Sequence, residues 1–320
     1  MSKRHITIVQ LSDAEHATLI TYYRAAHATY RGATKGIGRA IALNLASRGA
    51  SIFGTYSSPE SAHHLDTLSH TVSALYNNGS HGPKGPRVTG IAANLLSPSS
   101  STDIAAALEK EFDGHVDILV NNAAYIEGKV IGEMTPEYVH KMLLGNIEAP
   151  VLLVNELVKR NMFRPNSRIV NISADRVRAP VVGGSLYTAA KAALEALVRS
   201  WAVELGTRKG MEGTTGTVPQ TPPSSSSSSS SSRPSMPQTN LTTITANAVC
   251  VGLINSHFHR TNPPERLQAL KKERLPRQAV GSRIGECEDI ADIVGFLCGE
   301  SSRWVTGSVM SGNGGAEMIH

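Results

Sequence analysis

The sequence predicts an α/β fold, a doubly wound parallel sheet formed as a single domain. Three observations support this prediction. Short aliphatic runs alternate with longer segments whose apolar residues recur at helical spacing, the pattern of a parallel sheet with helices on both faces. A glycine-rich turn precedes the first helical segment, as such folds require. The 320 residues, without an irregular N-terminus and a serine-rich stretch, leave the length of one large domain.

The individual elements follow from local patterns. Strands are expected where short β-branched or aliphatic runs end at turn residues, at 51–56, 87–95, 116–120, 167–172, 244–251 and 305–310. Helices are expected where apolar residues lie three and four apart, at 39–48, 59–75, 103–112, 136–161, 186–205 and 288–297. The run VDILV at 116–120 is continuous enough to be buried on both faces of a parallel sheet.

The first strand is atypical. A doubly wound sheet needs an apolar strand that runs directly into the glycine-rich turn, but residues 25–31 are only partly strand-like. A better strand, ITIV at 6–9, lies about 20 residues too early. We therefore expect an atypical N-terminal segment over 1–25 and a Rossmann-type domain over 26–320.

Residues 207–243 interrupt this domain between a helix and a strand. They include nine consecutive serines at 224–232 with prolines on either side, and they hold few apolar residues. Such a segment cannot offset the entropy of ordering, so we expect a disordered insertion. The cost to stability is small because loop-closure entropy grows only logarithmically with length.

Composition excludes several classes of protein. The formal net charge is +5, and no basic block is interleaved with aromatic residues, so nucleic-acid binding is not expected. No Cys/His framework has zinc spacing, so no metal site is expected. No apolar run approaches the roughly 18 residues of a membrane span. Three cysteines, odd in number and not closely paired, indicate a reducing compartment, and a cytoplasmic protein is expected.

The glycine-rich turn carries the first functional signal. Gly32, Gly36 and Gly38, with Lys35 and Ile37 between them, open the helix at 39–48. Glycine lets the backbone turn tightly, and the free N–H groups and dipole of a helix N-terminus favour an anion such as a pyrophosphate. Alone, this pattern is a weak signal, because an ordinary glycine-rich turn also fits it.

The second strand indicates which dinucleotide the turn suits. NAD-binding folds place an acidic residue near the end of this strand, where it binds the ribose 2′-hydroxyl. Here the strand is followed by Ser57 and Ser58, and Lys35 and Arg39 lie at the turn. No carboxylate would repel a 2′-phosphate, so the sequence favours NADP(H).

A tyrosine and a lysine share one face of a later helix. Tyr187 and Lys191 are four residues apart, one helical turn. A free tyrosine has a pKa of about 10 and is a poor acid–base catalyst at neutral pH. A nearby cation stabilises the phenolate and lowers that pKa, which makes the phenol useful for proton transfer. A lone pair of this kind is also common on the surface of helices.

The combination of motifs is more specific than any one of them. The glycine-rich turn, Asn121-Asn122-Ala123-Ala124 after a buried strand, Asn146 on the next helix and the Tyr187/Lys191 pair occur in this order. Together they resemble the short-chain dehydrogenase/reductase family, and most closely its NADP-dependent 3-oxoacyl reductase-like branch. The resemblance runs from about Gly32 to Gly315 and is interrupted by the serine-rich insertion.

The resemblance implies an enzyme that reduces a ketone or aldehyde to an alcohol, or the reverse, by hydride transfer with NADPH. Tyr187 would be the general acid, Lys191 would hold the nicotinamide ribose, and Asn146 would position a water. Family members also imply a homodimer or homotetramer, and a substrate lid at 257–278 with Leu267, Leu270 and Leu275. The further cofactor contacts implied are Gly32, Lys35, Gly36, Ile37, Gly38, Ser57, Asn94, Leu95, Asn122, Ile254 and Ser256.

One departure from the family pattern affects the chemistry. The serine that orients the substrate carbonyl usually lies 13 residues before the tyrosine, and this position is Ala174. Its neighbour Ser173 is a candidate replacement if a bulge turns it inward, because successive strand residues otherwise face opposite sides. Ser185 is a second candidate. Together with the weak first strand, Ala174 also supports an alternative, a non-catalytic or impaired cofactor-binding scaffold.

Overall fold

The sheet confirms the predicted doubly wound fold. The computed structural model describes residues 18–21, 36–77, 85–206, 208–209, 241–256, 264–281 and 283–319. Seven strands pair in the order β3-β2-β1-β4-β5-β8-β9, and every pair is parallel. They are β1 (Thr18–Thr21), β2 (Ser51–Tyr56), β3 (Val88–Ala92), β4 (Val116–Asn121), β5 (Phe163–Ala174), β8 (Thr245–Val251) and β9 (Val309–Gly312).

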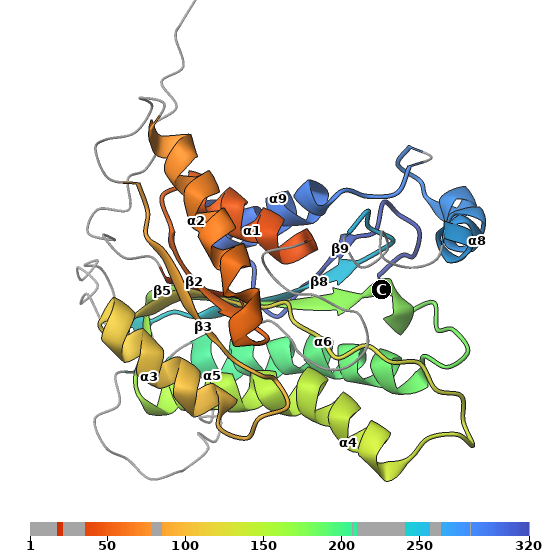
Figure 1. Ribbon diagram of the computed structural model, residues 1–320, viewed down its shortest axis with the longest axis horizontal. Helices are drawn as coiled ribbons and strands as arrows, with labels where there is room; N and C mark the ends of the chain where they lie inside the picture. The colour runs from red at the N-terminus through yellow and green to blue at the C-terminus, as the bar shows by residue number, and fades with distance from the viewer. Residues whose placement is uncertain are drawn as a thin grey trace, which may run out of the picture.

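Helices cover both faces of this sheet (Figure 1). One layer holds α1 (Gly36–Ser47), α2 (Ala62–Asn77) and α9 (Cys287–Cys298). The other holds α3 (Ser100–Phe112), α4 (Pro136–Leu143), α5 (Ala149–Lys159) and α6 (Ser185–Gly206). The neighbouring β4 residues Leu119 and Val120 are both fully buried but belong to different core clusters. Alternate residues of one strand thus supply the two cores on either side of the sheet.

The first strand corrects the sequence-based expectation. The structure places a strand at Thr18–Thr21, inside the segment expected to lie outside the domain, whereas 6–9 and 25–31 lie outside the described residues. This strand, TLIT, pairs with both β2 and β4 and so lies in the middle of the sheet. Residues 22–35, between this strand and α1, lie outside the described residues.

The single long helix expected at 136–161 is divided into three parts. A π-helical turn, Leu144–Glu148, separates α4 from α5. Pro150 lies near the start of α5 and has no N–H to donate to the carbonyl of Asn146, four residues earlier. The missing donor explains why the α-helical ladder is interrupted here, and π-helical turns often mark functional sites.

The serine-rich insertion begins and ends on a short ladder. Strands β6 (Arg208–Lys209) and β7 (Leu241–Thr242) pair antiparallel at its base. Residues 210–240 lie outside the described residues, so the expectation of disorder is not tested there.

Helix α8 (Pro264–Arg274) lies beyond the carboxyl ends of the strands, near the C-terminus (Figure 1). A short turn, Leu275–Arg277, follows it. Both elements fall in the region expected to form the lid, although residues 257–263 of that region lie outside the described residues.

Candidate active site

The predicted tyrosine–lysine pair lies on α6 beside the end of β5. The Nζ atom of Lys191 is 5.7 Å from the centre of the Tyr187 ring and donates to the Ile172 carbonyl at 2.8 Å. Lys191 is almost completely buried, whereas Tyr187 is partly buried. The structure therefore brings together the phenol and the ammonium as their spacing predicts, and ties the lysine to β5.

The electrostatics of this pair differ from the expectation. Burial raises the pKa of Tyr187 to about 12, although the positive charge of Arg176 acts in the opposite direction. Burial also lowers the pKa of Lys191 to about 8. Desolvation thus sets the direction of the tyrosine shift, and the charge that opposes it is that of Arg176 rather than the expected Lys191. At neutral pH the phenol is protonated, which suits a group that gives up a proton.

Asn146 lies in the π-helical turn with its side chain fully engaged. Its amide oxygen accepts from the Tyr125 backbone N–H at 3.1 Å, and its amide nitrogen donates to the carbonyls of Tyr125 at 2.8 Å and Met142 at 2.9 Å. These bonds occupy both amide hydrogens and tie the π-helical turn to the segment after β4. A water near Asn146 would therefore meet its main chain more readily than its side chain.

Ser173 is turned away from the expected position. Its hydroxyl donates to Glu195 Oε1 at 2.6 Å, and Arg178 Nη1 donates to the same oxygen at 2.5 Å. Arg178 also binds the sulfur of Cys250. We call Ser173, Arg178, Glu195 and Cys250 the β5–α6 network.

The register of β5 explains this orientation. Ser173 pairs with Cys250 and Ala174 with Val251 without interruption, so no bulge turns Ser173 toward the other face. We therefore do not place Ser173 at the substrate carbonyl, in contrast to the sequence-based assignment. Ser185, the second candidate, is the first residue of α6 and its side chain is exposed.

The start of α1 fits a dinucleotide phosphate. Gly36 has a φ of 64°, a conformation that favours glycine, and Gly38 is buried. The first turn of α1 holds no acidic residue that would repel an anion. Gly32 and Lys35 lie outside the described residues.

The other residues expected to contact the cofactor follow the ends of strands. Ser57 follows β2, and its hydroxyl lies 3.4 Å from that of Ser61. Arg39, in contrast, donates to Thr71 on α2 at 3.0 Å, so it is already engaged on the helix layer. The Asn94 side chain accepts from the Leu96 backbone N–H at 3.0 Å and shapes the turn after β3.

Three further positions lie after β4 and β8. Half-buried Asn122 directly follows β4, whose last residue, Asn121, donates to Asn171 of β5 at 2.8 Å. After β8, Ile254 is buried and forms an isolated bridge with Gly285. The backbone N–H of Ser256 donates to the Ile254 carbonyl at 2.7 Å.

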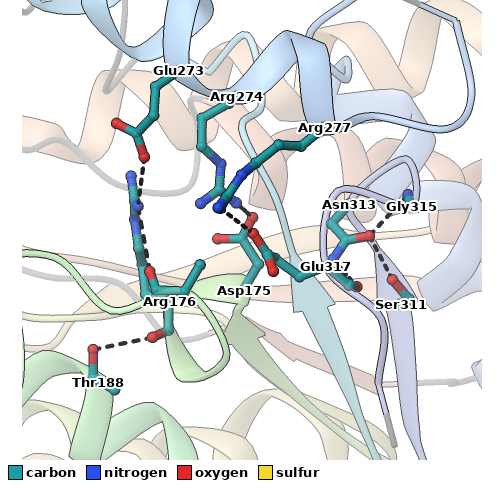
Figure 2. Close-up of polar contacts among 11 residues, drawn as sticks. Asp175, Arg176, Thr188, Glu273, Arg274, Arg277, Ser311, Asn313, Gly315 and Glu317 are labelled. Carbon is teal, nitrogen blue, oxygen red and sulfur yellow. Dashed lines mark hydrogen bonds and ion pairs between the residues drawn. The ribbon is translucent and has the colours of Figure 1, made fainter.

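A charged cluster that the sequence analysis missed connects α8 to the end of β5 (Figure 2). Arg274 binds Asp175, Glu273 lies 3.9 Å from Arg176, and Arg277 lies 2.7 Å from Glu317. We call these six residues the α8 cluster. The dipeptides Asp175-Arg176 and Glu273-Arg274 have complementary charges, but they lie about 100 residues apart, and only the fold reveals that they meet.

The lid is therefore held differently from the expectation. Leu267, Leu270 and Leu275 are each only half-buried, whereas Arg274 is 2% exposed. Whether these leucines cover a ligand remains a prediction. The attachment that the structure shows for α8 is made by charged side chains.

The part of the chain that the structure describes has neither a membrane-spanning helix nor a metal-binding cluster. Its helices include none that is long and apolar enough to cross a lipid bilayer. Its His, Cys, Asp and Glu side chains include no group of three that could hold a metal ion.

Comparison with known proteins identifies the family to which these features belong. A family model described as short chain dehydrogenase matches residues 26–212, and one described as enoyl-(acyl carrier protein) reductase matches residues 238–317. The interval between the two matches, residues 213–237, falls within the serine-rich insertion.

Individual relatives agree over most of the chain. An NADPH-dependent aldehyde reductase of Arabidopsis thaliana chloroplasts is 29% identical over 89% of this chain and 91% of its own length. A 3-oxoacyl-[acyl-carrier-protein] reductase of Pseudomonas aeruginosa is 30% identical over 90% of this chain and 95% of its own length. The solved structure of a blue fluorescent protein from a metagenomic library, in complex with NADPH, is similar with a TM-score of 0.69. It is 27% identical and covers 95% of this chain and 98% of that one.

Proposed function

This chain belongs to the short-chain dehydrogenase/reductase family, and from that premise we propose that it is an NADP(H)-dependent oxidoreductase. It reduces a ketone or aldehyde to an alcohol, or catalyses the reverse reaction, with Tyr187 as general acid. The observation that carries this proposal is the Tyr187/Lys191 pair at the end of β5, with the phenol protonated at neutral pH.

The cofactor site is assigned from several observations. NADP(H) suits a glycine-rich helix start without acidic residues and a β2 end followed by serines. An NADPH-dependent relative and a similar structure that holds NADPH support the same choice. When bound, the cofactor supplies or accepts the hydride. The residues that would hold it are Gly32, Lys35, Gly36, Ile37, Gly38, Ser57, Asn94, Leu95, Asn122, Tyr187, Lys191, Ile254 and Ser256.

The protein's own residues handle the proton. Tyr187 holds it on Oη and donates it to the carbonyl oxygen of the substrate. Lys191 lies one helical turn away and is fixed by the Ile172 carbonyl, so its charge faces the phenol in a constant position. The Asn146 side chain fixes the π-helical turn in which it lies. Its main chain would then hold a water that returns a proton to the phenol.

Ala174 supports one alternative, a cofactor-binding scaffold with impaired or no catalysis. The missing hydroxyl would cost about 3 kcal/mol of transition-state stabilisation, which slows turnover strongly but does not abolish it. Titration with NADPH separates the two functions. A scaffold binds NADPH and turns over no carbonyl substrate, whereas the enzyme does both.

The decisive experiment is an NADPH-oxidation assay over a panel of ketones and aldehydes, with Tyr187→Phe as the matched variant. We expect turnover with the native protein and its loss with the variant, because phenylalanine has no proton to donate. Equal turnover in both would reject Tyr187 as the acid.

We further propose that the protein forms a homodimer or homotetramer and works in the cytoplasm. The first proposal rests on the family resemblance, which implies association through the segments 136–161 and 186–205, and size-exclusion chromatography with light scattering tests it. The second rests on the free cysteines, of which Cys250 and Cys287 are buried. Fractionation of cells tests it.

A further inference from the structure

Arg274 is an unusual residue for the helix that carries it. Every other α8 residue whose burial the structure describes is exposed or half-buried, yet Arg274 is 2% exposed. Arginine is almost never fully buried unless it has specific partners. We therefore expect polar partners around the buried guanidinium of Arg274.

The contacts of Arg274 in the structure satisfy only part of the hydrogen-bonding capacity of its guanidinium. Arg274 Nη2 binds Asp175 Oδ2, and the carboxylate fixes the orientation of the guanidinium plane. Arg274 Nη1 is buried and has no hydrogen-bond partner among the described residues. A buried donor without an acceptor carries a desolvation cost, so the arrangement favours an oxygen atom from outside the chain.

The location connects this donor to the reaction. Asp175 directly follows Ala174, where the family places the serine that meets the substrate carbonyl. Thr188, next to Tyr187, donates to the carbonyl of Arg176 at 3.3 Å, and the charge of Arg176 acts on the pKa of Tyr187. The segment that holds Arg274 thus also borders the catalytic phenol, with Arg274 between Arg176 and Glu317 (Figure 2).

The charges in the α8 cluster indicate how a ligand is recognised. Its three arginines are balanced by three carboxylates, so the cluster does not attract every anion through a strong field. Recognition instead depends on the directed N–H groups of Arg274. A guanidinium N–H forms a strong, charge-assisted hydrogen bond with an anionic oxygen, and a single carboxylate fits a cluster without a strong positive field.

We propose that Arg274 binds a carboxylate of the substrate, so that this enzyme prefers oxo acids, carbonyl compounds with a carboxylate near the reacting carbonyl. The inference rests on the proposed reductase function and adds the substrate class. Asp175 acts as a positioning residue because it holds the guanidinium that contacts the substrate.

The test compares oxo acids with their methyl esters. Methyl ketones with the carboxylate one, two or three methylenes from the carbonyl are assayed for kcat/KM with NADPH. We expect the native protein to prefer the acid for at least one chain length, by about 10- to 100-fold, the range of a hydrogen bond to a charged group. The acid-to-ester ratio is the readout because a general loss of activity does not change it.

Three variants complete the experiment. Arg274→Lys retains the charge beside Asp175 but loses the planar fork, and we expect the ratio to fall to about one. The double variant Asp175→Asn with Arg274→Gln leaves no unpaired buried charge and should give the same result if Arg274→Lys folds poorly. Lys272→Gln removes one positive charge from an exposed position of the same helix and should preserve the ratio.

The outcomes separate this inference from the proposed function. If esters are reduced as well as acids by the native protein, or if Arg274→Lys and the double variant keep the native ratio, the carboxylate site is wrong and the reductase function stands. If neither acids nor esters nor any carbonyl of the panel is reduced, both proposals fail.

Discussion

Two arginine–carboxylate pairs flank the end of β5, and they differ in burial, because Arg274 of the α8 cluster is buried whereas Arg178 of the β5–α6 network is half-buried. In the β5–α6 network, Glu195 accepts from both Ser173 and Arg178, and none of the four side chains is among the buried polar groups without a partner. In the α8 cluster, Arg274 is paired with Asp175 but keeps one buried donor unpaired. Every buried side-chain nitrogen and oxygen atom of the β5–α6 network thus has a partner, whereas the α8 cluster keeps one buried donor without one.

The difference separates structural polar groups from groups available for function. The bond from Ser173 to Glu195 ties β5 to α6, whereas an unpaired buried donor gains a partner when a ligand arrives. The two sets begin only two residues apart on the chain, at Ser173 and Asp175. Their different roles therefore follow from the partners that the fold brings to each residue, and not from their place in the sequence.

The largest expected effect is on the catalytic side of this comparison, at Tyr187. We expect Tyr187→Phe to lower kcat by about 10²- to 10⁴-fold, the usual contribution of a positioned general acid. The free energy of unfolding should change by less than about 1 kcal/mol, because the partly buried ring is retained. NADPH oxidation at saturating substrate and urea denaturation measure the two effects. A large loss of stability with unchanged kcat would show that Tyr187 stabilises the fold and is not the general acid.

The second prediction addresses the β5–α6 network. Glu195→Ala should lower the free energy of unfolding by about 1–3 kcal/mol, because the buried Ser173 hydroxyl loses its acceptor and the half-buried Arg178 loses its carboxylate. Urea denaturation measures this, with Glu204→Ala, an exposed glutamate on the same helix, as the control. If both variants lose the same small amount, the network does not stabilise the fold.

The sequence predicts the fold well where local pattern and chain order suffice. The strand at 51–56 and the helix at 186–205 have aliphatic runs of the right period, and the structure has them at Ser51–Tyr56 and Ser185–Gly206. The pairing of Tyr187 with Lys191 also follows from the sequence, because one helical turn separates them.

The remaining features depend on contacts that no local pattern encodes. The sequence analysis missed the first strand, Thr18–Thr21, because the four residues TLIT are too few to show a period. Its place between β2 and β4 is set by tertiary contacts. The partner of Ser173 comes from another element, and so does that of Arg274. The raised pKa of Tyr187 depends on burial, which spacing alone does not report.

The third prediction uses the pH dependence of stability. Burial lowers the pKa of Lys191 from 10.5 to about 8, so between these values the folded protein binds fewer protons at this site than the unfolded chain. The Lys191 contribution to the free energy of unfolding therefore rises with pH from 8 to 10, by about 2 kcal/mol.

Other groups oppose this rise, so a matched variant is needed. The raised pKa values of Cys250 and Cys298 make stability fall above pH 9. The difference between the native protein and Lys191→Met, measured by urea denaturation at each pH, isolates the lysine. A flat difference from pH 7 to 10 would mean that the ammonium is not desolvated by the fold.

The smallest effect tests whether the two sides of β5 are correctly distinguished. Ala174 has an extended backbone and lies on the face opposite Ser173, so Ala174→Ser introduces a hydroxyl without backbone strain. We expect kcat/KM for a carbonyl substrate to rise about 10-fold, less than the full value of a pre-organised donor because the neighbouring groups have not adapted to it. Ser173→Ala should leave kcat/KM unchanged and lower the free energy of unfolding by about 1–3 kcal/mol, because Glu195 loses a buried donor. The opposite pattern, a loss of turnover in Ser173→Ala and no gain in Ala174→Ser, would mean that Ser173 faces the substrate and that the β5–α6 network opens in solution.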